Sequence, residues 1–218
     1  MSRVLRVPPG RAGRLWLRRR LDVARRGAEL LDHKLRILHA ERQRLALLVE
    51  RTGAAWAAAS LDADKWLLRA CLQGGQRGVR LAATAAPLDM DVTWTRSMGV
   101  RYPAEATFAA ARPDPGEAPA GNAALVTARE AHRAAVDAAV RHAVAEGAAR
   151  VVAAEEAATR RRLRAIEERW VPRLEEALAG VELALEEREH AEGVRLRWAA
   201  GLGGARPGER TERAEASP

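Results

Sequence analysis

The chain has 218 residues and a net charge of +8, and 48% of its residues are hydrophobic although only 4% are aromatic. Its apolar content is therefore mostly Ala, Leu and Val, which suits slender helix pairs better than a thick core. A single cysteine, Cys71, excludes an internal disulfide and a multi-cysteine zinc site, and no stretch approaches the roughly 18 apolar residues of a membrane span. We expect a soluble, intracellular protein.

Positive charge is concentrated near the N-terminus, where residues 1–60 contain fourteen Lys or Arg against five Asp or Glu. Such a segment suits an acidic protein surface, nucleic acid or anionic lipid, and the charge alone does not choose among them. The arginine runs 18–20, 25–26 and 160–162 can instead flank a helical seam and pair with Glu across it. We favour this second interpretation because base-stacking aromatics are scarce.

Residues 12–73 are predicted to form a long coiled-coil helix after a flexible basic lead-in, 1–11. Apolar residues recur at alternating steps of four and three over more than five heptads, which is typical of a coiled coil. Arg42 and Thr52 interrupt the repeat, and the helix is expected to end at Gly74–Gly75. The apolar heptad residues are Leu17, Leu21, Ala24, Ala28, Leu31, Leu35, Leu38, Leu45, Val49 and Trp56.

Residues 74–121 are predicted to form a small head that contains a β-hairpin over 88–102. Apolar and polar residues alternate in 88–94 and again in 98–102, which indicates two short strands. We expect the three residues between these runs to connect the strands and Pro103 to close the second one. Candidate contact residues of the head are Val92, Trp94, Met98, Val100 and Tyr102.

A second coiled-coil helix is predicted over 122–200, with Asn122 as its N-cap. It follows a Pro/Gly-rich loop, 111–121, and precedes a tail, 201–218, whose composition is typical of disorder. Its N-terminal half carries a stripe of small apolar residues, namely Val136, Val140, Val144, Val151 and Ala158.

This stripe shifts phase near Arg160–Arg162, which indicates a stutter, and Pro172 is expected to remove one backbone hydrogen bond and kink the helix. At 1.5 Å per residue the two helices would be about 90 and 115 Å long. The predicted fold class is all-α: a long antiparallel two-helix coiled coil with a small head containing a short hairpin. Candidate seam residues are Leu17, Leu21, Leu31, Leu35, Leu38, Leu163, Ile166, Trp170, Leu174 and Leu185.

Patterns of catalytic or metal-binding residues do not emerge from the sequence. No two of the five histidines are four residues apart, as a metal-binding pair on one helical face would be. The Gly-rich segments 74–78 and 201–204 lack the Gly-Lys-Ser/Thr ending of a phosphate loop. Adjacent carboxylates such as Glu167–Glu168 diverge by about 100° on a helix. We therefore expect no catalytic, cofactor or metal residues.

Three segments resemble the D subunit of the V-type and archaeal-type (V/A-type) rotary ATPases. The first is the basic helix start, 13–34 (GRLWLRRRLDVARRGAELLDHK). The second is Met98–Pro103 (MGVRYP), which is similar to the family's Met-Gly-Val-x-x-Pro. The third and most specific is 159–189, with TRRRLRAIE, VPRLEE and LEERE in the family's order.

The resemblance implies a non-catalytic central-stalk rotor shaft on the cytoplasmic side of the cell membrane. In that family the shaft couples ATP synthesis or hydrolysis in a hexamer of catalytic A and nucleotide-binding B subunits to proton or sodium translocation. The F subunit of the central stalk and the socket subunit of the membrane ring (C/d type) are the other implied partners, and ATP, ADP and Mg are bound by partner subunits. Candidate hexamer-contact residues are Arg18, Arg19, Arg25, Arg26, Arg188 and Arg195.

The alternative is a basic coiled-coil scaffold that binds nucleic acid or an anionic surface through residues 1–60. A steep fall of DNA affinity with salt would favour this alternative, because such a fall reports phosphate contacts. For the shaft we expect no nucleic-acid partner.

Overall fold

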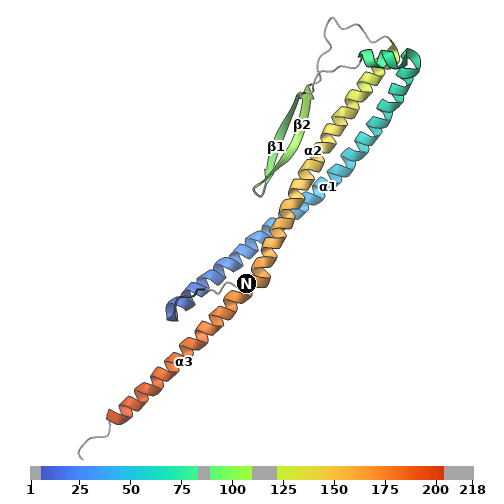
Figure 1. The fold of residues 1–218 in the computed structure, drawn as a ribbon. Coiled ribbons are helices and arrows are strands. Elements are labelled where there is room, and N and C mark those ends of the chain that lie inside the picture. The colour runs from blue at the N-terminus through green and yellow to red at the C-terminus, as the bar shows by residue number, and fades with distance from the viewer. Residues whose placement is uncertain (1–5, 83–88, 110–121, 204–218) are drawn as a thin grey trace, which may run out of the picture. The chain divides into compact units, whose positions relative to one another are not determined.

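The computed structural model describes residues 6–82, 89–109 and 122–203 (Figure 1). Its elements in chain order are α1 (Gly10–Ala82), β1 (Asp89–Ser97), β2 (Val100–Ala109), α2 (Ala123–Ala165), the π-helical turn η1 (Ile166–Trp170) and α3 (Val171–Gly203). The predicted fold class is confirmed: two long helices and a small antiparallel hairpin make up the described chain. Within that part of the chain, every helix is too polar or too short to cross a membrane.

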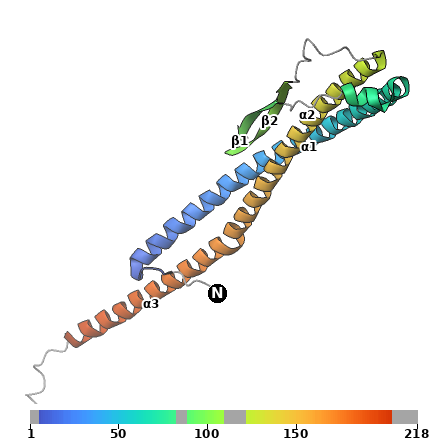
Figure 2. The same cartoon turned by 45° about the horizontal axis from the view of Figure 1, so that its top comes forward.

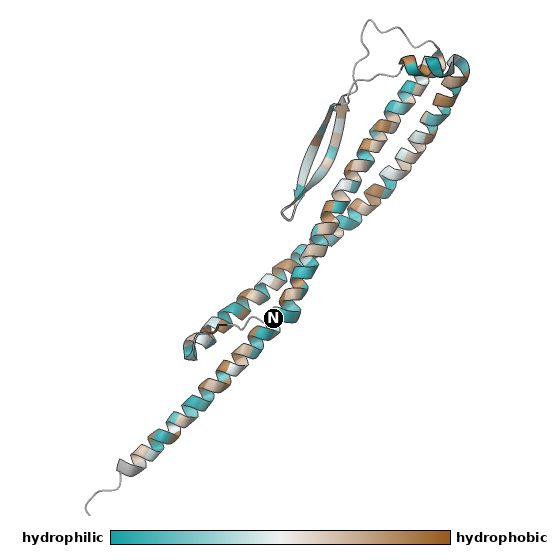
Figure 3. Cartoon of the chain, in the orientation of Figure 1, coloured by the Kyte–Doolittle hydropathy of each residue, from teal (hydrophilic) through white to brown (hydrophobic). Residues whose placement is uncertain are grey.

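The chain divides into two units, which are described separately. Unit 1 comprises 1–29 and 163–218, and unit 2 comprises 30–162. Hydrophilic and hydrophobic residues are interleaved along the helices of each unit (Figure 3), so each helix buries only one stripe. The predicted loop 111–121 and most of the predicted tail lie outside the described residues, although α3 continues to Gly203.

Unit 1 is an antiparallel pair formed by the start of α1 and by η1 with α3. Leu17, Leu21 and Ala24 of α1 pack against Leu174, and Val7 of the segment predicted as a flexible lead-in joins this cluster. Half-buried residues extend the cluster on both sides: Trp16, Ile166, Trp170, Val171, Ala177, Leu178 and Val181. The seam predicted for this region is therefore present, and large apolar side chains fill it.

Two ion pairs fix the level of the α1 residues in unit 1. Arg18 pairs with Glu182, and Arg25 pairs with Glu175. Leu21 lies between the two arginines on α1, which places it level with Ala179 and next to Leu178, a member of the same cluster. Residues later in α1 pair with residues earlier in α3, so the two helices run antiparallel.

In unit 2, α1 packs against α2 along a seam of smaller residues. Leu38 and Leu45 of α1 meet Ala148 and Val152 of α2. A second cluster at the far end of the pair contains Ala70, Ala124, Leu125 and Ala128. The heptad predicted for α1 is confirmed at its buried leucines and alanines, while Leu31, Leu35 and Val49 are half-buried. The prediction is wrong at Trp56, which is 42% exposed and stacks on the His142 ring.

The stripe predicted for α2 is wrong at Val151, which is exposed, whereas its neighbour Val152 is fully buried. Val136, Val140, Val144 and Ala158 are half-buried. The residues that α2 does bury in this stretch are Ala145, Ala148, Val152, Glu156 and Thr159. The spacing of the valines alone therefore does not mark the buried face of α2, which also takes in Glu156 and Thr159.

The first helix was predicted to end at Gly74–Gly75, but the structure has only a local break there. Gly75 has a left-handed φ of 69°, which interrupts the helix at the expected glycine pair, but helical residues resume and continue to Ala82. Glycine adopts this backbone conformation without the steric cost that a Cβ would bring. The break therefore bends the chain without ending its helical character.

The hairpin is longer than predicted and turns at a different place. Ser97 pairs with Val100, so Met98 and Gly99 form the two-residue turn, with φ values of 47° and 82°. Two positive φ angles are those of a type I′ turn, whose twist matches the strands. Pro103 does not close β2: it pairs with Trp94 next to a register shift, and β2 continues to Ala109. A proline is tolerated at such an irregularity because it need not donate to the ladder.

The second helix begins as predicted. The Asn122 side-chain oxygen accepts a hydrogen bond from the backbone N–H of Leu125 at 2.8 Å, which confirms the N-cap. At the predicted irregularity the chain forms η1 directly before Pro172, and the N–H of Val171 bonds to the carbonyl of Ile166. Pro172 has no backbone N–H to donate, and the wider π-helical turn accommodates the missing hydrogen bond.

Candidate functional site

The hairpin is attached to the helices of unit 2 through Tyr102. Both views show the hairpin lying along α2 (Figures 1 and 2). The buried ring of Tyr102 packs against Leu38, Leu45 and Val152, and its hydroxyl donates a 2.7 Å hydrogen bond to the carboxylate of Glu41. One side chain therefore joins the hairpin to α1 and α2 together.

Glu41 is held ionised at this attachment. Arg44 donates hydrogen bonds to it, the shortest at 2.6 Å, and lowers the pKa of the Glu41 carboxyl; the bond from Tyr102 acts in the same direction. Burial raises the pKa of the Tyr102 hydroxyl, and the neighbouring Glu41 raises it further. The phenol therefore stays protonated and acts as a hydrogen-bond donor.

The five candidate residues of the head divide into two groups. Val100 and Tyr102 pack against the helices of unit 2. Met98 forms the turn, Val92 is half-buried, and Trp94 is about half exposed with the Arg101 guanidinium 4.8 Å above its ring. The candidate residues of β1, Val92 and Trp94, therefore lie on the partly exposed side of the hairpin. The candidate residues of β2, Val100 and Tyr102, attach the hairpin to the helices of unit 2.

The six candidate contact arginines also differ in what they touch. Arg18 and Arg25 donate to Glu182 and Glu175 across unit 1 at 2.6 and 2.7 Å, and Arg26 pairs with Asp22 on its own helix. The other three, Arg19, Arg188 and Arg195, lie exposed on the helices. The interpretation that arginines pair with Glu across the seam is confirmed for the first two.

A buried ionic cluster in unit 2 was missed by the sequence analysis. The Glu156 carboxylate is only 2% exposed, and it accepts hydrogen bonds or ion pairs from Arg42 at 2.8 Å, Arg160 at 2.7 Å and His39 at 3.2 Å. We call these four residues the Glu156 cluster. Its signal in the sequence was Arg42, a charged residue at a heptad seam position, whose half-exposed guanidinium reaches the buried carboxylate.

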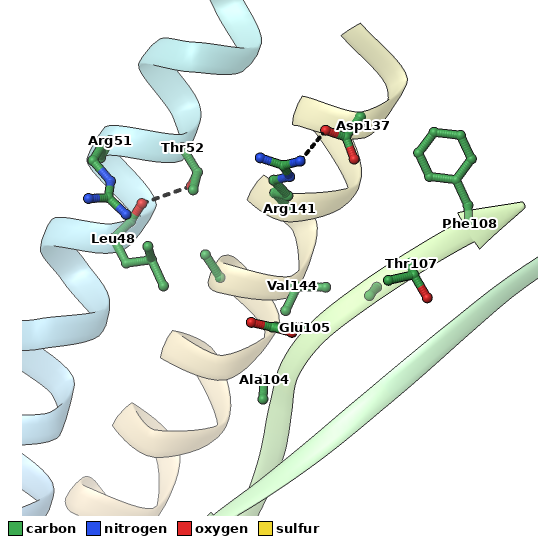
Figure 4. A pocket seen from close by; sticks show the side chains of 12 residues that line it. Leu48, Arg51, Thr52, Ala104, Glu105, Thr107, Phe108, Asp137, Arg141 and Val144 are labelled. Carbon is green, nitrogen blue, oxygen red and sulfur yellow. Dashed lines mark hydrogen bonds and ion pairs between the residues drawn. The ribbon is translucent and has the colours of Figure 1, made fainter. Parts of the chain in front are cut away.

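A cleft of about 610 Å³ lies between β2 and the two helices of unit 2. Figure 4 shows Glu105, Thr107 and Phe108 of β2 on one side and Arg51, Thr52 and Val144 of the helices on the other. The Arg141 guanidinium in its wall is paired with Asp137 at 2.5 Å. Metal-holding groups of three or more His, Cys, Asp or Glu are absent from the described residues. The walls of the cleft are mixed, with polar and apolar side chains from β2 and both helices.

Large apolar side chains project outward from both units. In unit 1 these are Leu15, Val23, Leu183, Val194, Leu196 and Trp198, and in unit 2 they include Leu30, Leu47, Leu61, Leu68 and Leu72. The heptad of α1 continues through the buried Ala63 and Ala70, and it does not include Leu61, Leu68 or Leu72. Continuing the heptad beyond Trp56 would have predicted their outward direction.

Comparison with known proteins agrees with this arrangement. The family model for the D subunit of ATP synthase matches residues 15–201. The D subunit of the V-type ATP synthase of Anaeromyxobacter sp. (strain Fw109-5) is 34% identical to the chain over 198 residues, which cover 88% of the chain and 92% of that protein. The chain belongs to the ATP synthase D-subunit family.

Proposed function

We propose that the chain is the central rotor shaft of a V/A-type rotary ATPase. In this role it transmits torque between a hexamer of catalytic A and nucleotide-binding B subunits and ion translocation through a membrane ring. The observation that carries the proposal is the outward-facing apolar surface of unit 1, with Leu15, Leu183, Leu196 and Trp198, in a chain of this family. A helix pair that exposes such residues needs a sleeve of protein around it.

The terminal helix pair is the part assigned to the hexamer cavity. Arg19, Arg188 and Arg195 are the arginines best placed to meet carboxylates of the sleeve, since Arg18, Arg25 and Arg26 already have acidic partners. An uneven distribution of charge around the pair presents a different face to each catalytic interface at each rotation angle. Hexamer state and shaft angle then bias each other reciprocally.

Unit 2 carries the remaining contacts in this proposal. The F subunit of the stalk and the socket subunit of the ring bind its outward leucines and the hairpin. The chain itself takes part in no catalytic step and binds no cofactor, and ATP, ADP and Mg belong to partner subunits. It sits peripherally at the cytoplasmic side of the membrane and turns with proton or sodium flow.

The proposal is tested by shortening α3 beyond the packed cluster of unit 1. A chain ending at Glu182 keeps the buried Leu174 and the half-buried Val181 but lacks Leu196 and Trp198. In the reconstituted complex we expect ATP hydrolysis to continue while ion transport per ATP falls several-fold. A chain ending at Gly203 is the matched control and should transport normally. Unchanged transport per ATP in the shorter chain would contradict the shaft.

A further inference from the structure

The apolar contacts of unit 2 leave the axial register of its helices weakly specified. The residues that α2 buries against α1 include Ala124, Ala128, Ala145 and Ala148, which are identical in size and shape. If α2 moved along α1 by one heptad, Ala131 and Ala135 could take the places of Ala124 and Ala128 with little change in packing, whereas the place of Ala148 would go to Glu155 or Arg141. In coiled coils of this kind, a single polar residue in the seam often decides the register.

The Glu156 cluster supplies such a residue with donors from both helices. Arg42 and His39 reach the carboxylate from α1, and Arg160 reaches it from the next turn of α2. The His39 Nε2 also accepts a hydrogen bond from the side-chain amide N–H of Gln43 at 3.1 Å. With a proton on Nδ1 and the amide donating to Nε2, a neutral ring satisfies both contacts.

A displaced register would separate these groups. A shift of seven residues brings Glu156 level with Leu35 or Val49 and brings Arg42 level with Ala149 or Leu163. The carboxylate would then be buried against apolar side chains without its cross-helix donors, which is strongly unfavourable. The native register is the one in which this carboxylate and Arg42 meet.

We propose that the Glu156 cluster is a register pin, which excludes axial slippage of α2 along α1 in unit 2. This inference concerns the chain alone and does not rest on the proposed function. Buried ion pairs contribute little net stability compared with well-packed apolar side chains. The cluster therefore acts by selecting the arrangement in which the Glu156 carboxylate meets Arg42 and His39.

The test measures the distance between spin labels on the two helices in the full chain. Labels are placed at Ala40→Cys and Ala134→Cys, two exposed positions, in a Cys71→Ser background. The pin is removed by Arg42→Leu with Glu156→Leu, so that no buried charge is left unpaired. The matched control, Asp32→Leu with Arg36→Leu, removes an exposed ion pair from α1.

We expect one narrow distance in the parent chain and in the control. The leucine pair should keep its helicity and add a second population displaced by about 10 Å, the length of one heptad. The exchange Arg42→Glu with Glu156→Arg should restore a single population, because the cross-helix pair is kept.

A single parent-like distance in the leucine pair would overturn the proposal. It would mean that contacts intact in every variant set the register instead, namely the packing of Tyr102, the Lys34–Glu155 ion pair and the Thr52–His142 hydrogen bond. If the leucine pair loses its helicity, Glu156→Gln gives the decisive measurement, since it keeps the side-chain volume and removes the charge. A displaced population in that variant supports the pin, and its absence refutes it.

Discussion

Units 1 and 2 are built on the same antiparallel two-helix plan but are held together differently. Unit 1 buries large residues, Leu17 and Leu174 among them, and places its cross-helix ion pairs at the surface. Unit 2 buries alanines beside Leu38 and Leu45, pairs cations from both helices with the buried carboxylate of Glu156, and adds a hairpin attached through Tyr102. A heptad pattern alone therefore does not tell whether a helix pair is held by apolar area or by polar contacts.

The largest expected effect comes from emptying the seam of unit 1. Leu174→Ala removes a fully buried side chain and should destabilise that unit by about 2–5 kcal/mol through lost transfer energy and the cavity left behind. Hydrogen exchange of α3 peptides in the full chain measures the effect locally. Leu183→Ala, on the exposed side of the same helix, is the control, and an equal effect there would show that the buried face is misassigned.

The next effect concerns the hairpin attachment of unit 2. Tyr102→Phe keeps the packed ring but removes the hydrogen bond to Glu41, which should lower the local stability of the hairpin by about 1 kcal/mol. The measurement is amide hydrogen exchange of the hairpin, which should become faster. Trp94→Phe alters the partly exposed side of the hairpin and should leave its exchange rates unchanged. If Tyr102→Phe matched this control, the attachment would depend on apolar packing alone.

The surface ion pairs of unit 1 should contribute less. Breaking the Arg25–Glu175 pair with Arg25→Ala is expected to cost about 0.2–1 kcal/mol, because both side chains are well exposed. The cost should shrink in concentrated salt, which screens exposed charges. A loss that persists at high salt would instead indicate that the arginine stem contributes packing.

A small acid-dependent effect distinguishes unit 2. Hydrogen bonding to Lys34 lowers the pKa of Glu155, and the bonds from Arg44 lower that of Glu41. Groups with a lowered folded-state pKa stabilise above their unfolded pKa of about 4.3, and this stability is lost as pH falls through the folded value. Below that pH, α2 exchange should accelerate in the parent chain and accelerate less in Glu155→Gln. Identical acid profiles would exclude the Lys34 contact as the cause.

The buried face of a helix could be predicted from the sequence only where its apolar residues differ clearly in hydrophobicity from their neighbours. Leucines spaced by three and four in α1 stand out against charged neighbours, so their burial was predictable. Alanines in α2 give no such contrast, and the stripe was placed on Val151 instead of Val152. The burial of Glu156 was hidden for a different reason, since an isolated glutamate is normally exposed and only tertiary contact with Arg42 reverses this.

The irregular backbone was predictable in place but not in form. Gly75 and Pro172 marked the helix irregularities correctly, yet neighbouring residues determined that one is a break with helix on both sides and the other a π-helical turn. In the hairpin, Gly99 identifies the turn, but Met98 is an uncommon residue at positive φ. Among the candidate contact arginines, pairing with Glu182 and Glu175 emerged only in the folded helix pair.

Direct observation of rotation tests the shaft most directly. A probe attached at Trp94→Cys in a Cys71→Ser background would be followed on single complexes whose A/B hexamer is fixed to a surface. Trp94 is suited to this because it is half exposed and lies away from the hairpin attachment. The account predicts that adding ATP makes the probe turn continuously in one direction and that removing ATP stops it. A probe that stays fixed relative to the hexamer while ATP is hydrolysed and ions are transported would contradict it.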